Sequence, residues 1–162
     1  MKKTINLELK MSELIFDIQN KTYLTGRSLS DGSNNYHVAN MQANDDEENE
    51  SQILRSITNA YAILRNRLAE YLDSDDNSSD NNSLKTTDTL MLMLAMPSNF
   101  NPASAKTIGE AAHQFIVSTS VADWFAITAK GETNDYSLVA EASLKTLEEA
   151  LCKRSRPKRG QD

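Results

Sequence analysis

The sequence has few of the residues that most often carry enzyme or metal chemistry. Its 162 residues include one cysteine, Cys152, and two histidines, His37 and His113. A single cysteine forms no internal disulfide and cannot build a zinc cluster, so a reducing compartment is expected. The two imidazoles lie in unrelated segments, which leaves a metal site or a catalytic triad without enough partners. We therefore expect no metal centre in this chain.

Glycine and long apolar runs are scarce as well. The five glycines are too scattered for a phosphate-binding loop, and no nucleophile elbow occurs. The longest apolar run, residues 90–96, is far shorter than the roughly 20 residues of a membrane helix. Glu8, Lys10 and Glu13 interrupt any apolar core of a signal peptide after the basic start. The sequence thus predicts a non-enzymatic protein with no cofactor and no membrane segment.

Charge is present but unevenly placed. The formal net charge is −6, yet residues 1–150 carry 12 Lys and Arg against 22 Asp and Glu, whereas residues 151–162 carry five against one. An acidic body repels nucleic acid, so any affinity for phosphate is expected from the basic end. An acidic protein groove is at least as suitable a target for that end.

Two segments are predicted to form a minor β element, residues 4–10 and 89–96. In the first, Ile5, Leu7 and Leu9 alternate with polar residues, which is typical of a half-buried strand. The second is apolar on both faces and ends before Pro97, which indicates a strand covered on both sides. We expect the two strands to pair.

The remaining pattern predicts a mainly α fold, a small bundle of about four helices. They span residues 12–25, 53–72, 102–130 and 133–151. In the first, helical spacing and a stop at Gly26 compete with a hairpin strand through residues 14–16. We expect one domain over residues 1–152, with polar loops at 29–52 and 73–88, and a basic tail at 153–162.

The acidic run at residues 45–50 is interpreted as the start of the second helix rather than as a binding site. Asn44 followed by Glu47 matches a capping box, and negative charge favours a helix N-terminus.

The third helix is apolar on two sides. Val117, Val121 and Trp124 lie opposite its main apolar face, and they are our candidates for a subunit interface together with Phe125. His113 lies beside this second face, where a packed, hydrogen-bonded role is expected rather than a ligand role.

The C-terminal end is the predicted partner-binding segment. Cations at the end of a helix also stabilise its dipole, which explains the first two basic residues without a partner. The candidate docking residues are Leu151, Lys153, Arg154, Arg156, Pro157, Lys158 and Arg159.

Four stretches resemble small virion proteins of tailed phages and prophages of gut Bacteroidota, including crAss-like phages. They are residues 21–27 (KTYLTGR), 110–117 (EAAHQFIV), 121–125 (VADWF) and 153–157 (KRSRP). The helical layout with a charged C-terminal extension is similar to head–tail connector (adaptor) proteins. The resemblance implies a homo-oligomeric ring in the virion neck, assembled in the host cytoplasm between portal and tail proteins. It also implies that residues 151–159 dock on the portal.

Other functions stay open at this point. A tail-terminator or head-completion protein is not separable from an adaptor by sequence. A different class is a small cytoplasmic nucleic-acid-binding regulator that uses the basic tail. In a virion, contact with nucleic acid is expected only through proximity to packaged DNA.

Overall fold

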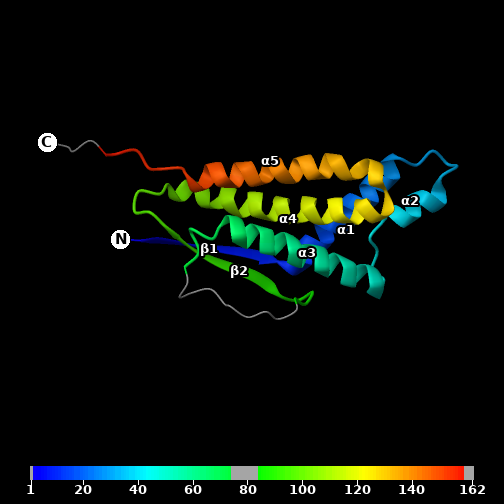
Figure 1. The fold of residues 1–162 in the computed structure, drawn as a ribbon, viewed down its shortest axis with the longest axis horizontal. Helices are drawn as coiled ribbons and strands as arrows, with labels where there is room; N and C mark the ends of the chain where they lie inside the picture. The colour runs from blue at the N-terminus through cyan, green and yellow to red at the C-terminus, as the bar shows by residue number, and fades with distance from the viewer. Residues whose placement is uncertain (1, 74–83, 159–162) are drawn as a thin grey trace.

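The computed structural model describes residues 2–73 and 84–158, and therefore leaves out residues 74–83 of the predicted linker 73–88 (Figure 1). The predicted mainly helical class with a minor β element is confirmed, although the described residues hold five α-helices rather than about four. None of the helices in the described ranges is long and apolar enough to cross a membrane. The elements are β1 (Lys3–Lys10), α1 (Met11–Ser28), α2 (Asn35–Met41), α3 (Glu47–Arg67), β2 (Thr89–Met96), η1 (Pro102–Ser104), α4 (Ala105–Thr128), η2 (Lys130–Glu132) and α5 (Thr133–Leu151).

The two strands pair as predicted. β1 and β2 are antiparallel, in a register that sets Leu7 opposite Leu92. Alternate side chains of β2 are buried, whereas Met91 between them is 52% exposed. The expectation that β2 is covered on both sides is therefore wrong, because an antiparallel sheet can bury one face and leave the other in water.

The second edge of β2 is occupied by the chain that follows α3. The main-chain oxygen of Tyr71 accepts a hydrogen bond from the amide of Ala95 at 2.7 Å. Leu72 forms an isolated bridge with Leu94. Within the described residues, β2 therefore has backbone neighbours on both edges and β1 on only one.

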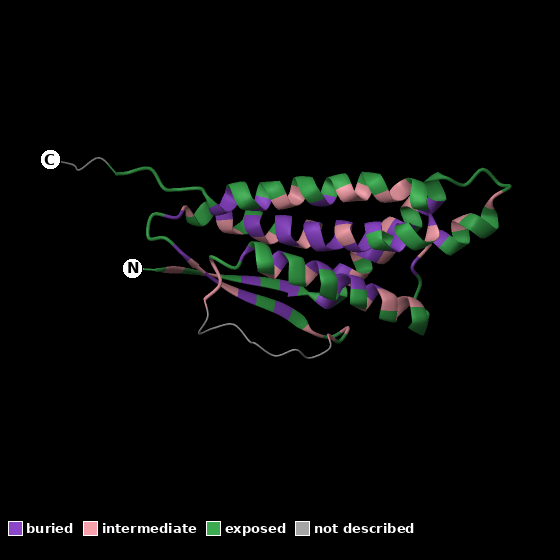
Figure 2. Cartoon of the chain, viewed as in Figure 1, coloured by how far each residue is buried: buried purple, intermediate pink, exposed green. Residues whose placement is uncertain are grey.

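α4 is the central helix. It packs against α5, α3, α1 and β1, and Figure 2 shows that most of its length is buried. The indole N–H of Trp124 donates to the carbonyl oxygen of Met41 at 2.7 Å and so ties α4 to α2. Both apolar faces of α4 are covered by other parts of the same chain.

α1 covers the predicted span 12–25 and continues to Ser28, so the alternative of a hairpin strand is wrong. Gly26 lies inside the helix instead of ending it. A Cβ at Gly26 would stand 3.2 Å from the carbonyl oxygen of Val38, so the missing side chain lets α2 lie close to α1. α2 lies within the predicted loop 29–52 and is the helix that the sequence analysis missed.

α3 begins at Glu47 with acidic residues in its first turn, as predicted. The predicted capping box is wrong, because Asp46 rather than Asn44 occupies the N-cap position and makes no side-chain cap bond. The helix ends at Arg67 and not at residue 72, since the residues that follow pair with β2.

α4 and α5 form an antiparallel hairpin (Figure 1). The side chain of Asn101 caps η1 by accepting a hydrogen bond from the amide of Ala103 at 3.1 Å. The short turn η2 keeps the two helices side by side, and the rings of Phe125 and Tyr136 lie 5.5 Å apart between centroids.

Candidate functional site

Leu151, the first of the predicted docking residues, is part of the core. It is the last residue of α5 and is 2% exposed. The expectation that Leu151 contacts a partner is wrong, because the fold itself covers this helix end. Arg159 lies outside the described residues. The other predicted docking residues are exposed beyond the end of α5, namely Lys153, Arg154, Arg156, Pro157 and Lys158.

The base of this docking segment, residues 153–158, is held by backbone pairing. Arg154 forms an isolated antiparallel bridge with Phe100. The amide of Ser155 donates to the carbonyl oxygen of Asn99 at 2.8 Å. The segment therefore leaves α5 in an extended conformation and from a fixed position.

Arg154 acts within the fold. Its Nη1 donates to the carbonyl oxygen of Leu151 at 2.8 Å and to that of Lys153 at 3.1 Å. The last carbonyls of a helix have no partner within the helix, and a cation there is favourable. Arg154 thus stabilises the end of α5. This is the role within the fold that the sequence analysis gave for the first two basic residues.

Beyond this base the cations are free. Arg156 and Lys158 are exposed and make no hydrogen bond or ion pair within the described part of the chain. Figure 2 shows the segment exposed and extending past the ends of α4 and α5. The charges of Arg156 and Lys158 are therefore available to a neighbouring molecule.

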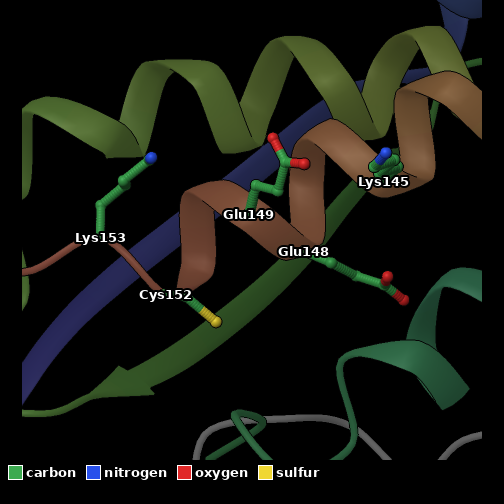
Figure 3. Close-up of a pocket in the computed structure, with 5 residues that line it drawn as sticks. All are labelled: Lys145, Glu148, Glu149, Cys152 and Lys153. Carbon is green, nitrogen blue, oxygen red and sulfur yellow. The ribbon is translucent and has the colours of Figure 1, made fainter.

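A shallow hollow of about 500 Å³ lies at the base of the segment, around the last turns of α5 (Figure 3). Glu148 in this hollow forms an ion pair with Arg67 of α3 at 3.1 Å, and both side chains are about half exposed. Charges of both signs suit a protein contact better than a single ionic ligand. Its lining residues are Lys145, Glu148, Glu149, Cys152 and Lys153.

The lining of the hollow includes one cysteine and no histidine. Cys152 is an exposed free thiol. Burial raises the pKa of nearby Tyr71, with a smaller upward contribution from Cys152. Among the described residues, no group of three or more His, Cys, Asp or Glu is placed to hold a metal ion.

The predicted subunit interface on α4 lies inside the protomer. Val117, Val121 and Phe125 are fully buried, and Trp124 is 7% exposed. They are not accessible to a neighbouring subunit, because α4 is surrounded by elements of its own chain. The apolar residues on two sides of α4 thus result from its central position in the fold and not from an oligomer contact.

The expected role of His113 is confirmed. Its Nε2 lies 2.6 Å from Oδ2 of Asp17 on α1, and its side chain is 20% exposed. This pair ties α4 to α1 at one end of a groove that the sequence analysis did not find.

The groove lies between β1 and α4 and has a volume of about 450 Å³. Gly109, in the second turn of α4, is the sequence signal that marks it, since a glycine inside a helix leaves space beside the strand. Residues 5–8 line it from β1, and the remaining lining residues are Glu13, Ala105, Lys106, Gly109, Glu110 and His113.

Comparisons with protein-family models, curated proteins and solved structures find no match to this chain.

Proposed function

We propose that this chain is a non-enzymatic structural subunit of a tailed-phage virion, a head–tail connector (adaptor) that forms a ring between portal and tail. The observation that carries the proposal is the docking segment 153–158, which is fixed at its base and exposed beyond Arg154. The resemblance of four stretches of the chain to small phage virion proteins supports the virion setting and a location in the neck.

A segment of this kind is well suited to docking. Because residues 153–155 are already fixed against residues 99–101, less conformational entropy is lost when the segment binds. The free cations Arg156 and Lys158 supply electrostatic complementarity to an acidic groove on another protein of the assembly. The resemblance to connectors implies the portal as one protein of the assembly that could receive the segment.

The ring contacts are formed by the outer surface of the subunit, since α4 is internal. A closed ring uses a heterologous contact, in which one surface of each copy meets a different surface of the next. Contacts of this type need no buried apolar helix face on the free subunit.

The position of the protein in particles tests the proposal. Virions purified from cells that carry the gene are labelled with an antibody against the chain and imaged. We expect label at the neck, and its absence there would overturn the proposal.

Charge reversal tests the role of the segment in the same particles. The double variant Arg156→Glu/Lys158→Glu is expected to fold but to be missing from virions. The matched variant Arg27→Glu/Lys130→Glu makes the same change at exposed positions elsewhere and is expected to be incorporated. Equal incorporation of both variants would contradict a docking role for the segment.

The nucleic-acid-binding alternative predicts a different measurement. A regulator that uses its basic tail binds duplex DNA at low salt, with an affinity that falls steeply as salt increases. We expect the full chain to show little affinity, and a chain that ends at Ser155 to behave the same. Steeply salt-dependent binding that is lost on this truncation would favour the regulator.

A further inference from the structure

The groove follows the free edge of β1. β2 occupies one edge of β1, and within the described residues no backbone hydrogen bond reaches the other. Alternate residues of such an edge direct their N–H and C=O groups outward, where a further strand can pair. Residues 5–8 all line the groove although their side chains alternate between faces, and no residue of β2 does. The groove therefore lies along the edge of the sheet and not on its face.

α4 forms the opposite wall and leaves room for a bound segment. A Cβ on Gly109 would make one ordinary van der Waals contact, with Cδ1 of Leu7 at 3.8 Å, so the missing side chain widens the space beside the strand. Four strand residues extend about 13 Å. An extended segment of about four residues thus matches the length of β1 that lines the groove.

The lining of the groove is acidic. Glu8, Glu13 and Glu110 contribute three carboxylates, against one ammonium group from Lys106. His113 is already hydrogen-bonded to Asp17. A segment rich in Lys and Arg is the complementary occupant.

We propose that this groove receives the docking segment of a second copy of the chain, whose residues 156–158 add as a strand to the free edge of β1. The segment is exposed and basic, and at 153–155 it is already extended and paired like a strand. Pro157 lacks an N–H group, which is tolerated in an added edge strand. In its own protomer the segment is tied to residues 99–101 and runs outward beyond the ends of α4 and α5 (Figure 1).

The proposed contact depends on the proposed function in one respect, the docking role of segment 153–158. The receptor of the segment in this contact is another copy of the chain and not the portal. It is an addition of a strand to a sheet edge, in which backbone hydrogen bonds provide affinity and side chains provide specificity. Because the segment and the groove are different surfaces, the contact is heterologous and is compatible with a ring.

Sedimentation velocity of the full chain over a range of concentrations tests the contact. We expect the wild type to self-associate at low salt, and Gly109→Arg, which fills the groove, to remain monomeric. Gly131→Arg is the matched control, because a side chain there meets open space. Circular dichroism verifies that each variant is folded. A monomeric wild type, or a Gly109→Arg variant that associates like the wild type, would overturn the proposal.

Charge exchange gives a test that does not depend on a loss of function. The groove variant Glu8→Lys/Glu110→Lys and the segment variant Arg156→Glu/Lys158→Glu are each expected to lose self-association. Mixed together they are expected to regain it, since each segment then meets a groove of opposite charge. The control Glu141→Lys, on the exposed side of α5, is expected to leave association unchanged.

The outcomes separate this contact from the proposed function. If the segment variant is lost from virions while both groove variants still self-associate and enter particles, the groove is not the receptor and the docking role stands. If the charge-exchanged pair fails to associate while the wild type does, the contact uses other surfaces and the proposal is overturned.

Discussion

Replacement of Trp124 by phenylalanine decides whether α4 is a core helix or an interface helix. Trp124 is 7% exposed, and its indole N–H donates to the carbonyl oxygen of Met41 at 2.7 Å. Trp124→Phe removes the donor and leaves a buried carbonyl without its partner, at a cost of about 1–3 kcal/mol. The smaller ring also loses buried apolar contact, which adds about 1–2 kcal/mol. We expect a total loss of about 2–5 kcal/mol, a large part of the roughly 5–15 kcal/mol stability of a domain.

The assay is urea unfolding followed by circular dichroism, because the variant lacks the only tryptophan in the chain. Phe16→Leu serves as a control, since Phe16 is 65% exposed on α1 and its replacement is expected to change stability by less than about 0.5 kcal/mol. A loss below about 1 kcal/mol for Trp124→Phe, combined with a change in oligomeric state, would refute the burial argument. It would restore α4 as a subunit interface.

Three further predictions follow from single contacts. Gly109→Ala is expected to raise the thermal midpoint by a gain of up to about 1 kcal/mol in helix propensity, whereas Gly26→Ala lowers it because its Cβ would crowd the Val38 carbonyl; equal effects would contradict this. Arg154→Ala removes two hydrogen bonds at the end of α5, and we expect faster hydrogen exchange of the Ser155 backbone amide. Unchanged protection of this amide would disprove the prediction. Desolvation by neighbouring groups raises the pKa of Asp123, so its charged form weakens the fold, though only slightly because the residue is exposed and solvent screens the charge. Asp123→Asn is therefore expected to stabilise the protein slightly at neutral pH. This gain should shrink as the pH falls through the raised pKa of the folded state and be gone below the ordinary aspartate pKa near ~3.9; a gain that persists in acid would argue against it.

The elements that the sequence predicted correctly are those specified within a few residues. The alternation of Ile5, Leu7 and Leu9 predicted β1, and the apolar run before Pro97 predicted β2. The helical patterns of residues 102–130 and 133–151 predicted α4 and α5. In each case the local pattern and the tertiary environment favour the same conformation.

What the sequence did not predict depends on contacts between distant segments. α2 has only seven residues, and Met41 at its end accepts a hydrogen bond from Trp124, 83 positions away. The wrong prediction of an interface on α4 has the same cause. The segments that cover its second apolar face are distant in sequence, and the apolar pattern alone does not specify whether the same chain or a neighbour covers it. The groove was missed because the free edge of β1 depends on which segments pair with β2. Gly109 marked its position, but only the fold shows that this glycine faces the strand.

The basic segment and the acidic groove lie on different surfaces of the chain, and this distribution of charge bears on how copies could associate. Of the basic residues at the C-terminal end, Arg154 is bonded to carbonyls of its own chain, whereas Arg156 and Lys158 are free within the described residues. The carboxylates of Glu8 and Glu110 line a groove on the same chain. Two segments of like charge repel each other, and so do two acidic grooves, which disfavours a two-fold dimer through either surface. Only the proposed contact of a segment with a groove joins opposite charges, and because each copy carries one of each, repetition of such a contact would generate a ring if the rotation closes.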